Sequence, residues 1–222
     1  MRLLLILTLF INAINAQEIN DIIDSQDEYM SMMLDRAEKG NAYAQKNLAK
    51  YYHYSKAPIR DLDQAIYWYE KAAENGNTQS ALTLSNFYSA GFLGEENKSK
   101  MALYWLEKAT ANNDPLAQVN LAWLLVTSED NSIRDAKRAL AIIEKYGNKV
   151  GFTSGIIDTL AAIHAELGNF DKAVTLQETA LFLIQKSDNK QRIASHKNRL
   201  SLYKQHKKFT GFAHENMEAY QD

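Results

Sequence analysis

The residues of this chain that could carry chemistry are few, and they do not form a recognisable active site. Residues 187–190 contain a Ser-Asp-Asn string and a Ser-x-x-Lys string, both of which occur in serine β-lactamases. In those enzymes the two strings are far apart in the sequence and a Lys-Thr-Gly follows them. Here the strings overlap and Lys-Thr-Gly is absent. We therefore interpret the match as chance and expect no catalytic residues.

Signatures of metal and cofactor sites are also missing from the sequence. The chain contains no cysteine, which excludes thiolate metal sites and disulfides. Its five histidines are scattered, and His214-Glu215 lacks the second histidine of a zinc protease motif. No Gly-rich phosphate loop is present, and a formal charge of −2 gives no general attraction to nucleic acid phosphates. We expect no metal, no cofactor and no nucleic acid partner.

The strongest pattern is a repeat. Residues 65–72 read Ala-Ile-Tyr-Trp-Tyr-Glu-Lys-Ala, and residues 102–109 read Ala-Leu-Tyr-Trp-Leu-Glu-Lys-Ala. A weaker copy begins at Ala139, so that Ala65, Ala102 and Ala139 are 37 residues apart each time. Repeats of about 20 to 50 residues indicate stacked supersecondary units that bury a core between neighbours and leave a long surface free for partners. The pattern favours a binding scaffold over a catalyst.

Signals for the start of a helix fall where the repeat requires them. Asp61 precedes Gln64 by three residues, which is the arrangement of a capping box. Asp114 is followed by Pro115, an N-cap residue before a proline at the first helical position. In the third unit we expect the second helix to open at Ser132. These signals and the repeat agree in predicting two helices per unit.

These residues resemble the Sel-one-like repeat, a longer relative of the tetratricopeptide repeat. The resemblance covers residues 33 to 146 or thereabouts, and its third unit is degenerate, with Ile142 in place of the tryptophan. It places Trp68 and Trp105 in the core of the repeat. The matching positions of the first two units are Ala44, Leu48, Tyr51, Asp61, Ala65, Trp68, Ala72, Ala73 and Gly76, and then Leu84, Tyr88, Gly91, Ala102, Trp105 and Ala109.

We predict an all-α fold, a right-handed superhelical solenoid of antiparallel helix pairs. Residues 1–16 are expected to be a signal peptide, and residues 17–41 a leader and an N-terminal capping helix. Three Sel-one-like repeats follow over residues 42–148. A tetratricopeptide-like repeat is expected over residues 149–187, and a C-terminal capping helix and tail over residues 188–222.

The first sixteen residues have the layout of a secretory signal peptide. Arg2 precedes an apolar run over residues 3–11, and Ala13 and Ala16 are small residues suited to cleavage. The run is shorter than the roughly 20 residues that span a bilayer, and no cysteine follows it for lipid attachment. We expect cleavage after Ala16 and a periplasmic or secreted mature chain without a transmembrane segment. An uncleaved membrane anchor is the alternative.

The closing segment is rich in cations and has no acidic residue between Asp188 and Glu215. We expect a terminal helix that covers the last repeat through Leu200 and Tyr203 and keeps its charges in solvent. The alternative is an electropositive surface that docks on an anionic partner. Residues 209–222 are expected to be a frayed tail, or to pack back onto the array through Phe209 and Phe212. The cations are Lys190, Arg192, Lys197, Arg199, Lys204, Lys207 and Lys208.

The resemblance implies a protein that binds peptides or proteins in a concave groove, but it names no ligand. If the first helices of the units line this groove, the leucine positions place in it Lys46, Lys50, Tyr54, Asn86, Trp123, Asp158 and Glu166. The alternative is that these are solvated helix faces and that Trp123 packs against the next unit. We expect a non-enzymatic protein- or peptide-binding scaffold of the cell envelope. A cell-wall-associated ligand-binding protein or enzyme, related to peptidoglycan or β-lactams, is the alternative.

Overall fold

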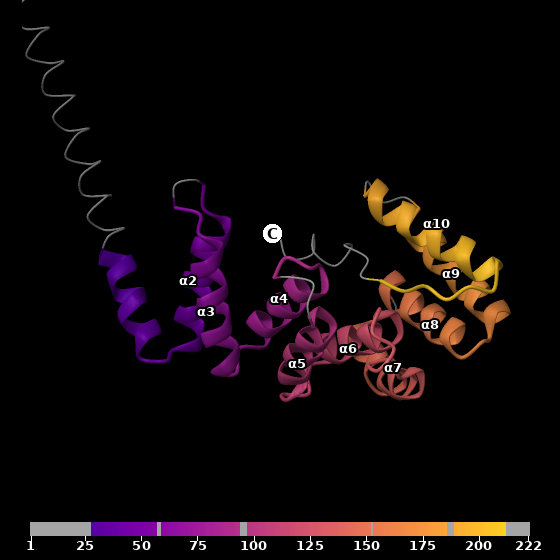
Figure 1. The fold of residues 1–222 in the computed structure, drawn as a ribbon, viewed down its shortest axis with the longest axis horizontal. Helices are drawn as coiled ribbons and strands as arrows, with labels where there is room; N and C mark the ends of the chain where they lie inside the picture. The colour runs from indigo at the N-terminus through magenta and orange to yellow at the C-terminus, as the bar shows by residue number, and fades with distance from the viewer. Residues whose placement is uncertain (1–27, 57–58, 94–96, 152, 186–188, 212–222) are drawn as a thin grey trace, which may run out of the picture. The chain divides into compact units, whose positions relative to one another are not determined.

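The computed structural model describes residues 28–56, 59–93, 97–151, 153–185 and 189–211, and the regular structure in these ranges is entirely α-helical (Figure 1). This agrees with the predicted all-α helical repeat. The chain divides into two compact units, residues 1–75 and residues 76–222. The predicted signal peptide, Ser187, Asp188 and Phe212 lie outside the described residues. Within the described ranges, no helix combines the length and the apolar character needed to cross a membrane.

The first unit contains helical residues 28–38, α2 (Ala42–Tyr54) and α3 (Leu62–Glu74). Asn41 and Asp61 are the N-caps of α2 and α3, and each side chain accepts a hydrogen bond from the backbone of the third helical residue. The buried Gln45 donates to the carbonyl of Ala37 and accepts from Asn75, both at 2.9 Å. This side chain therefore fastens the end of each neighbouring helix to α2.

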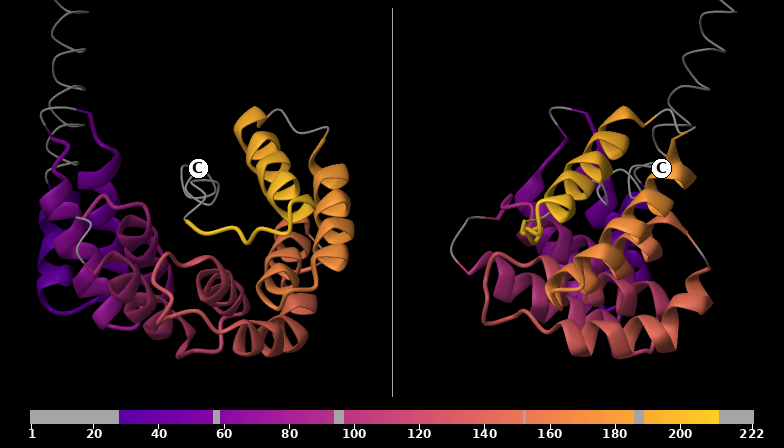
Figure 2. Two further views of the ribbon diagram at one scale, coloured as in Figure 1. Left: turned by 45° about the vertical axis from the view of Figure 1, so that its right-hand side comes forward. Right: turned by 90° about the vertical axis from the view of Figure 1, so that its right-hand side faces the viewer.

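The second unit contains the remaining seven helices that the structure describes: α4 (Thr78–Ser89), α5 (Lys98–Thr110), α6 (Pro115–Thr127), α7 (Ala136–Val150), α8 (Ser154–Glu166), α9 (Phe170–Ile184) and α10 (Lys190–Lys204). Each helix packs against the next one in the chain, and α6 also packs directly against α8. Figure 2 shows α10 lying against α9 at the end of this series. The packing of α6 on α8 creates the surface on which the candidate site lies.

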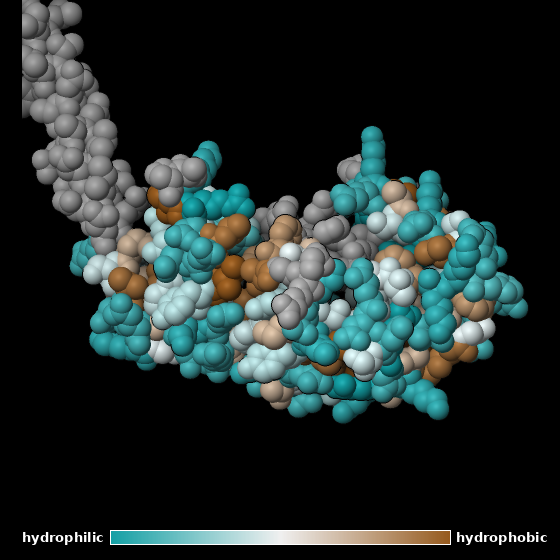
Figure 3. All heavy atoms as spheres, viewed as in Figure 1, coloured by the Kyte–Doolittle hydropathy of each residue, from teal (hydrophilic) through white to brown (hydrophobic). Residues whose placement is uncertain are grey.

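Alanines at the repeat positions allow the helices to approach closely. Ala65, Ala102 and Ala139 are fully buried, as the repeat predicts. Trp68 and Trp105 are also buried, which confirms their predicted place in the core of the repeat. Outside the core, Figure 3 shows a largely hydrophilic surface with smaller hydrophobic areas between the charged side chains.

The start of α7 differs from the prediction. Its N-cap is Asp135 rather than Ser132, and the Asp135 carboxylate accepts a hydrogen bond of 2.9 Å from the Arg138 backbone. Ser132 lies in the preceding turn, where its backbone N–H and its hydroxyl both donate to the Asp130 carboxylate. Because the Ser132 side chain is engaged in that turn, it caps no helix, and the aspartate three residues later takes this role.

Candidate functional site

A pocket of about 130 Å³ lies among α6, α8 and α10 of the second unit. We call it the α6–α8–α10 pocket. Apolar side chains on α6 and at the start of α8 form part of its wall, and polar side chains of all three helices form the rest. Its lining residues include Leu116, Asn120, Trp123, Ile156, Asp158, Thr159, Arg192 and His196. The pocket therefore combines an aromatic ring with several hydrogen-bonding groups.

Helical spacing explains why these side chains converge. Asn120 and Trp123 are three residues apart on α6, and Arg192 and His196 are four residues apart on α10, so each pair shares one helical face. Thr153 is the N-cap of α8 and brings the first turn of this helix to the pocket. Arg192 reaches across from α10 and donates a 2.7 Å hydrogen bond to the Ser154 hydroxyl.

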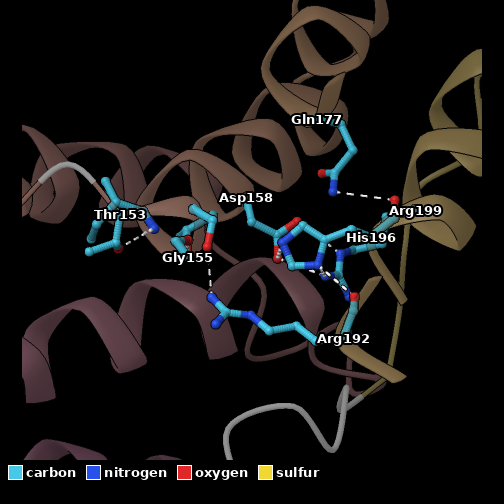
Figure 4. Close-up of polar contacts among 10 residues, drawn as sticks. Thr153, Gly155, Asp158, Gln177, Arg192, His196 and Arg199 are labelled. Carbon is cyan, nitrogen blue, oxygen red and sulfur yellow. Dashed lines mark hydrogen bonds and ion pairs between the residues drawn. The ribbon is translucent and has the colours of Figure 1, made fainter. Parts of the chain in front are cut away.

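A buried ion pair lies at the base of this site (Figure 4). Arg199 of α10 donates from Nε to Oδ1 of Asp158 at 2.9 Å, and its Nη2 lies 2.9 Å from Oδ2 of the same carboxylate. The arginine is fully buried and Asp158 is 5% exposed. Two parallel contacts between a guanidinium and a carboxylate fix both side chains in one orientation. The pair therefore fixes α10 on α8.

His196 extends this network toward α9. Its Nδ1 lies 3.0 Å from Nη2 of Arg199, and its backbone carbonyl accepts from Gln177 at 3.4 Å. The same Nδ1 lies 3.0 Å from the carbonyl oxygen of Arg192. A guanidinium can only donate and a carbonyl can only accept, so the two contacts favour opposite tautomers of His196. Figure 4 shows Asp158, His196 and Arg199 pointing toward one another from α8 and α10.

Two neighbouring aromatic rings pack against Arg199. Its guanidinium carbon lies 5.4 Å from the ring centre of Trp123 and 5.4 Å from that of Phe209. The two ring centres are 6.1 Å apart, with an angle of 35° between the planes. A guanidinium over an aromatic face is attracted by the ring's quadrupole, and the attraction is stronger when water is excluded. Phe209 therefore completes a site that α6 and α10 begin.

Residues 206–211, which we call the C-terminal segment, pack against helices of the second unit. His206 stacks on Phe170 with ring centres 5.1 Å apart. Lys208 Nζ lies 3.2 Å from Oε1 of Glu166, and the Gly211 backbone N–H donates to the carbonyl of Thr127 at 2.8 Å. The part of the predicted tail that the structure describes is therefore packed back on the array.

Glu166 is held from two sides. It forms an ion pair with Arg134, whose other amino group donates to the carbonyl of Ser128 at 3.0 Å, and it also receives Lys208. Arg134 comes from the loop before α7, and Ser128 directly follows α6. The carboxylate at the end of α8 thus links the end of α6 to the C-terminal segment.

The predicted groove residues of the second unit come together only in part. Trp123, Asp158 and Glu166 all contact either α10 or the C-terminal segment. Asn86 lies on α4 and is half-buried, and its Nδ2 finds no hydrogen-bond partner among the described residues. Asp158 and Glu166, which were predicted to line the groove, thus form ion pairs with Arg199, Arg134 and Lys208 of the same chain.

The other predicted residues lie on α2 in the first unit. Lys46 is half-buried and its Nζ lies 4.8 Å from the ring centre of Tyr43. Lys50 is exposed and its Nζ lies 5.9 Å from the ring centre of Tyr54. These contacts form an exposed surface of lysine and tyrosine side chains.

The buried face of α10 differs from the prediction. Tyr203 is fully buried, as expected, but it shares this face with His196 and Arg199, and Leu200 is only half-buried. The rings and alkyl groups around Tyr203 leave its hydroxyl without a hydrogen-bond partner among the described residues. Burial, followed by the nearby Asp158 carboxylate, raises the pKa of Tyr203 above its usual value. The fully buried residues of this helix are therefore His196, Arg199 and Tyr203, and not Leu200.

The sequence analysis missed Arg192, His196 and Arg199 as site residues because it treated the cations of α10 as surface charges. A signal was present in α8, where Asp158 is the only charged residue before Glu166 in an otherwise apolar helix. A carboxylate buried among apolar residues needs a cation or hydrogen-bond donors. That requirement points to an arginine elsewhere in the chain.

Two observations on the described residues concern metal ligation and the histidines. In the part of the chain that the structure describes, no group of three or more His, Cys, Asp or Glu side chains could hold a metal ion. Burial, followed by Lys172, lowers the pKa of His164, and burial, followed by Arg60, lowers the pKa of His53. Each shift favours a neutral packed imidazole. The arrangement suits recognition through an aromatic ring and hydrogen bonds.

Comparisons with known proteins support the repeat assignment. The model of the Sel1 repeat matches residues 42–77, 81–114 and 115–145. No curated protein matches the chain. The crystal structure of a protective antigen present in uropathogenic Escherichia coli strains, which displays an SLR fold, aligns with a TM-score of 0.54 and 23% identity. The alignment covers 86% of this chain and 43% of the antigen, so the chain spans less than half of that protein.

At this identity the antigen shows the fold alone, and its biological role carries no weight for this chain. Sel1-like repeat proteins are generally protein-interaction scaffolds. The repeat model matches three consecutive segments, and each segment contains a pair of helices. The aligned crystal structure has the same type of fold. Residues 42–145 of this chain therefore consist of three Sel1-like repeats.

Proposed function

We propose that this chain is a non-enzymatic scaffold of the cell envelope that binds a protein or peptide through the α6–α8–α10 pocket. The cell envelope follows from the signal peptide layout at residues 1–16, and the scaffold role from the repeat family. The observation that carries the proposal is the pocket itself, which places Trp123 beside hydrogen-bonding groups from three helices.

The size of the pocket favours a peptide side chain over a small-molecule ligand. Sites for drug-sized ligands occupy about 300–1,000 Å³, whereas this pocket measures about 130 Å³. One side chain fits such a volume. A β-lactam or a peptidoglycan fragment needs more enclosed space, so the pocket favours the scaffold over a cell-wall ligand-binding protein.

Arg192 gives the pocket a specific polar preference. Its guanidinium donates to the Ser154 hydroxyl, and no carboxylate pairs with it among the described residues. A guanidinium has five N–H donors, so donors remain for a carbonyl or carboxylate of a bound peptide. Asp158, the carboxylate of the same pocket, is already matched by Arg199.

The test is to block the mouth of the pocket and to follow the partner. Leu116 lines the pocket and is 43% exposed, so Leu116→Arg should obstruct it without disturbing the core. Leu183 on α9 is 50% exposed and does not line the pocket, so Leu183→Arg is the matched control. Crosslinking in the native envelope, followed by mass spectrometry, should show a partner for the wild type and the control that Leu116→Arg loses.

Two results would overturn the proposal. Equal crosslinking by Leu116→Arg and the wild type would show that the pocket is not the binding site. A covalent adduct with a fluorescent penicillin would favour the cell-wall alternative and contradict a purely non-enzymatic role.

A further inference from the structure

We propose that the C-terminal segment occupies a peptide site on α6 and α8, and that the partner is an extended peptide with a basic residue followed by an aromatic residue. This inference rests on the proposed function and specifies its partner. The partner peptide competes with residues 206–211 for the same contacts. The site borders the α6–α8–α10 pocket at Trp123, which belongs to both.

The path of the segment is that of a bound peptide. After α10 the chain continues without regular structure over residues 207–210 and runs back along the second unit, as Figures 1 and 2 show. It contacts Phe170 at the start of α9, then Glu166 at the end of α8, and then Thr127 at the end of α6. The segment thus crosses successive helices instead of extending α10.

Each contact uses a group that a separate peptide could supply. The final carbonyls of an α-helix have no partner within the helix, and the Gly211 N–H reaches the carbonyl of Thr127, the last residue of α6. This contact involves only backbone atoms, so it does not depend on the side chains of the peptide. Gly211 has a φ of 114°, a conformation that favours glycine. A competing peptide is therefore expected to have glycine two residues after its aromatic residue.

Two side chains provide the specificity. Phe209 packs against the Arg199 guanidinium next to Trp123, and a cation together with a neighbouring ring selects an aromatic group at this position. Lys208 pairs with Glu166, which selects a positive charge at the preceding position. Together they define the order basic, aromatic, any residue, glycine. The segment itself reads Lys-Phe-Thr-Gly over residues 208–211.

The segment is held weakly enough to exchange. Lys208 remains 49% exposed in its ion pair, and Phe209 is only half-buried. Its position directly after α10 keeps it at a high effective concentration, which favours the docked state without strong contacts. A segment docked for about nine tenths of the time lowers the apparent affinity for a competing peptide about tenfold.

The experiment uses the full chain and a fluorescent peptide with the sequence Gln-His-Lys-Lys-Phe-Thr-Gly. Fluorescence anisotropy should show weak binding to the wild type and about tenfold tighter binding to Phe209→Ala, because that variant vacates the site. Phe182 on α9 is 68% exposed and outside the site, so Phe182→Ala is the matched control and should bind as the wild type does. Circular dichroism verifies that both variants are folded.

A second variant guards against misfolding of the first. Lys208→Glu places like charges at Glu166, which should release the segment and produce the same gain in affinity. Peptides in which the phenylalanine is replaced by alanine, or the preceding lysine by glutamate, should lose the binding. These peptide changes test the site without altering the protein.

The inference is overturned if neither Phe209→Ala nor Lys208→Glu binds the peptide more tightly than the wild type. An equal gain by Phe182→Ala overturns it as well. If the peptide does not bind while Leu116→Arg still abolishes crosslinking, the scaffold function is retained. Only the proposed sequence of the partner peptide is then wrong. If the peptide binds as expected while crosslinking is unaffected by Leu116→Arg, the partner uses the segment site and not the pocket.

Discussion

At the scale of single residues, the Asp158–Arg199 pair has the largest consequences for stability. Burying a carboxylate and a guanidinium removes both from water, and their attraction offsets this cost only with good geometry. Here the two contacts of 2.9 Å supply that geometry, and the neighbouring rings of Trp123 and Phe209 pack against the guanidinium. Removing one member leaves the other charged and buried, so the two residues should behave as one unit.

A double-mutant cycle measures this coupling. Arg199→Met should lower the free energy of unfolding by about 3–5 kcal/mol, because Asp158 is left without its cation. Asp158→Leu should cost a similar amount, and the double variant should cost clearly less than the sum. The measurement is urea unfolding followed by tryptophan fluorescence. Additive effects would show that the pair is not coupled.

The exposed pair Lys204–Glu178 provides the control on the same helix. Both side chains are about half exposed, at 53% each, so water screens their attraction. Lys204→Met should change the free energy of unfolding by at most about 1 kcal/mol. The difference between the two positions measures the effect of burial on an ion pair.

His164 makes stability depend on pH. Burial, followed by the charge of Lys172, lowers the pKa of His164 in the folded chain. The unfolded chain, with a histidine pKa of about 6.5, therefore binds more protons as the pH falls below that value. The contribution of His164 to stability is fully present above about pH 6.5 and decreases below it.

Replacing His164 tests this sign. The urea midpoint of the wild type should decrease between pH 7.5 and 5.5 by more than that of His164→Phe, which keeps a ring at the position but cannot titrate. A wild-type slope in His164→Phe would contradict the predicted role of His164.

At the scale of elements, α10 closes the second unit through small residues. Tyr203 is buried against Ala161 and Ala165 of α8 and Ala173 of α9, which leave space for its ring. The sequence analysis predicted that Tyr203 covers the last repeat, because Leu200 and Tyr203 are three residues apart and share one helical face. It did not predict Arg199 on the same face, since a positively charged residue near the end of a chain usually lies in solvent.

Surface and buried cations of α10 should therefore respond differently. Lys197, Lys204 and Lys207 are exposed, as predicted, and changing all three to glutamine should shift the free energy of unfolding by only about 0.5 kcal/mol per site. Deleting residues 190–222 should instead expose Ala173 and Ala180 and leave Asp158 without its cation. Light scattering should then show aggregation.

Contrary results would separate the roles of this helix. A soluble truncated chain with an unchanged melting temperature would show that α10 is not a cap. A glutamine variant that stays folded but loses a partner would support the anionic docking surface that the sequence analysis left as the alternative.

At the scale of the whole molecule, the repeat predicted the helix pairs because each unit makes its core from the same positions. The burial of Ala65, Ala102 and Ala139 in the core could be predicted from the repeat spacing alone. The candidate site could not be predicted in this way, because its residues come from α6, α8, α10 and the C-terminal segment, which follow no common period. Contacts between elements distant in sequence depend on packing, and a local pattern does not contain them.

The division into two compact units was also not visible in the sequence. It falls between Asn75 and Gly76, at the end of the first repeat, although the repeat itself continues from one unit to the next. Repeat arrays are stabilised mainly by contacts between neighbouring units. The strength of each interface between neighbouring units therefore decides where an array divides. This strength cannot be inferred from the repeating residues alone.

The signal peptide that we propose for residues 1–16 would determine where a partner is met. An Ala-x-Ala-like site has small residues one and three positions before the cut. Here Ala16 directly precedes the expected cut before Gln17, and the larger Ile14 occupies the other position. Mass spectrometry of the exported protein should show a chain that begins at Gln17. Ala16→Leu should block the cut, whereas Asn15→Leu, at the unrestricted middle position, should not. Recovery of the Met1 or Arg2 terminus from the wild-type envelope fraction would show an uncleaved anchor, and the scaffold would then act at the membrane surface.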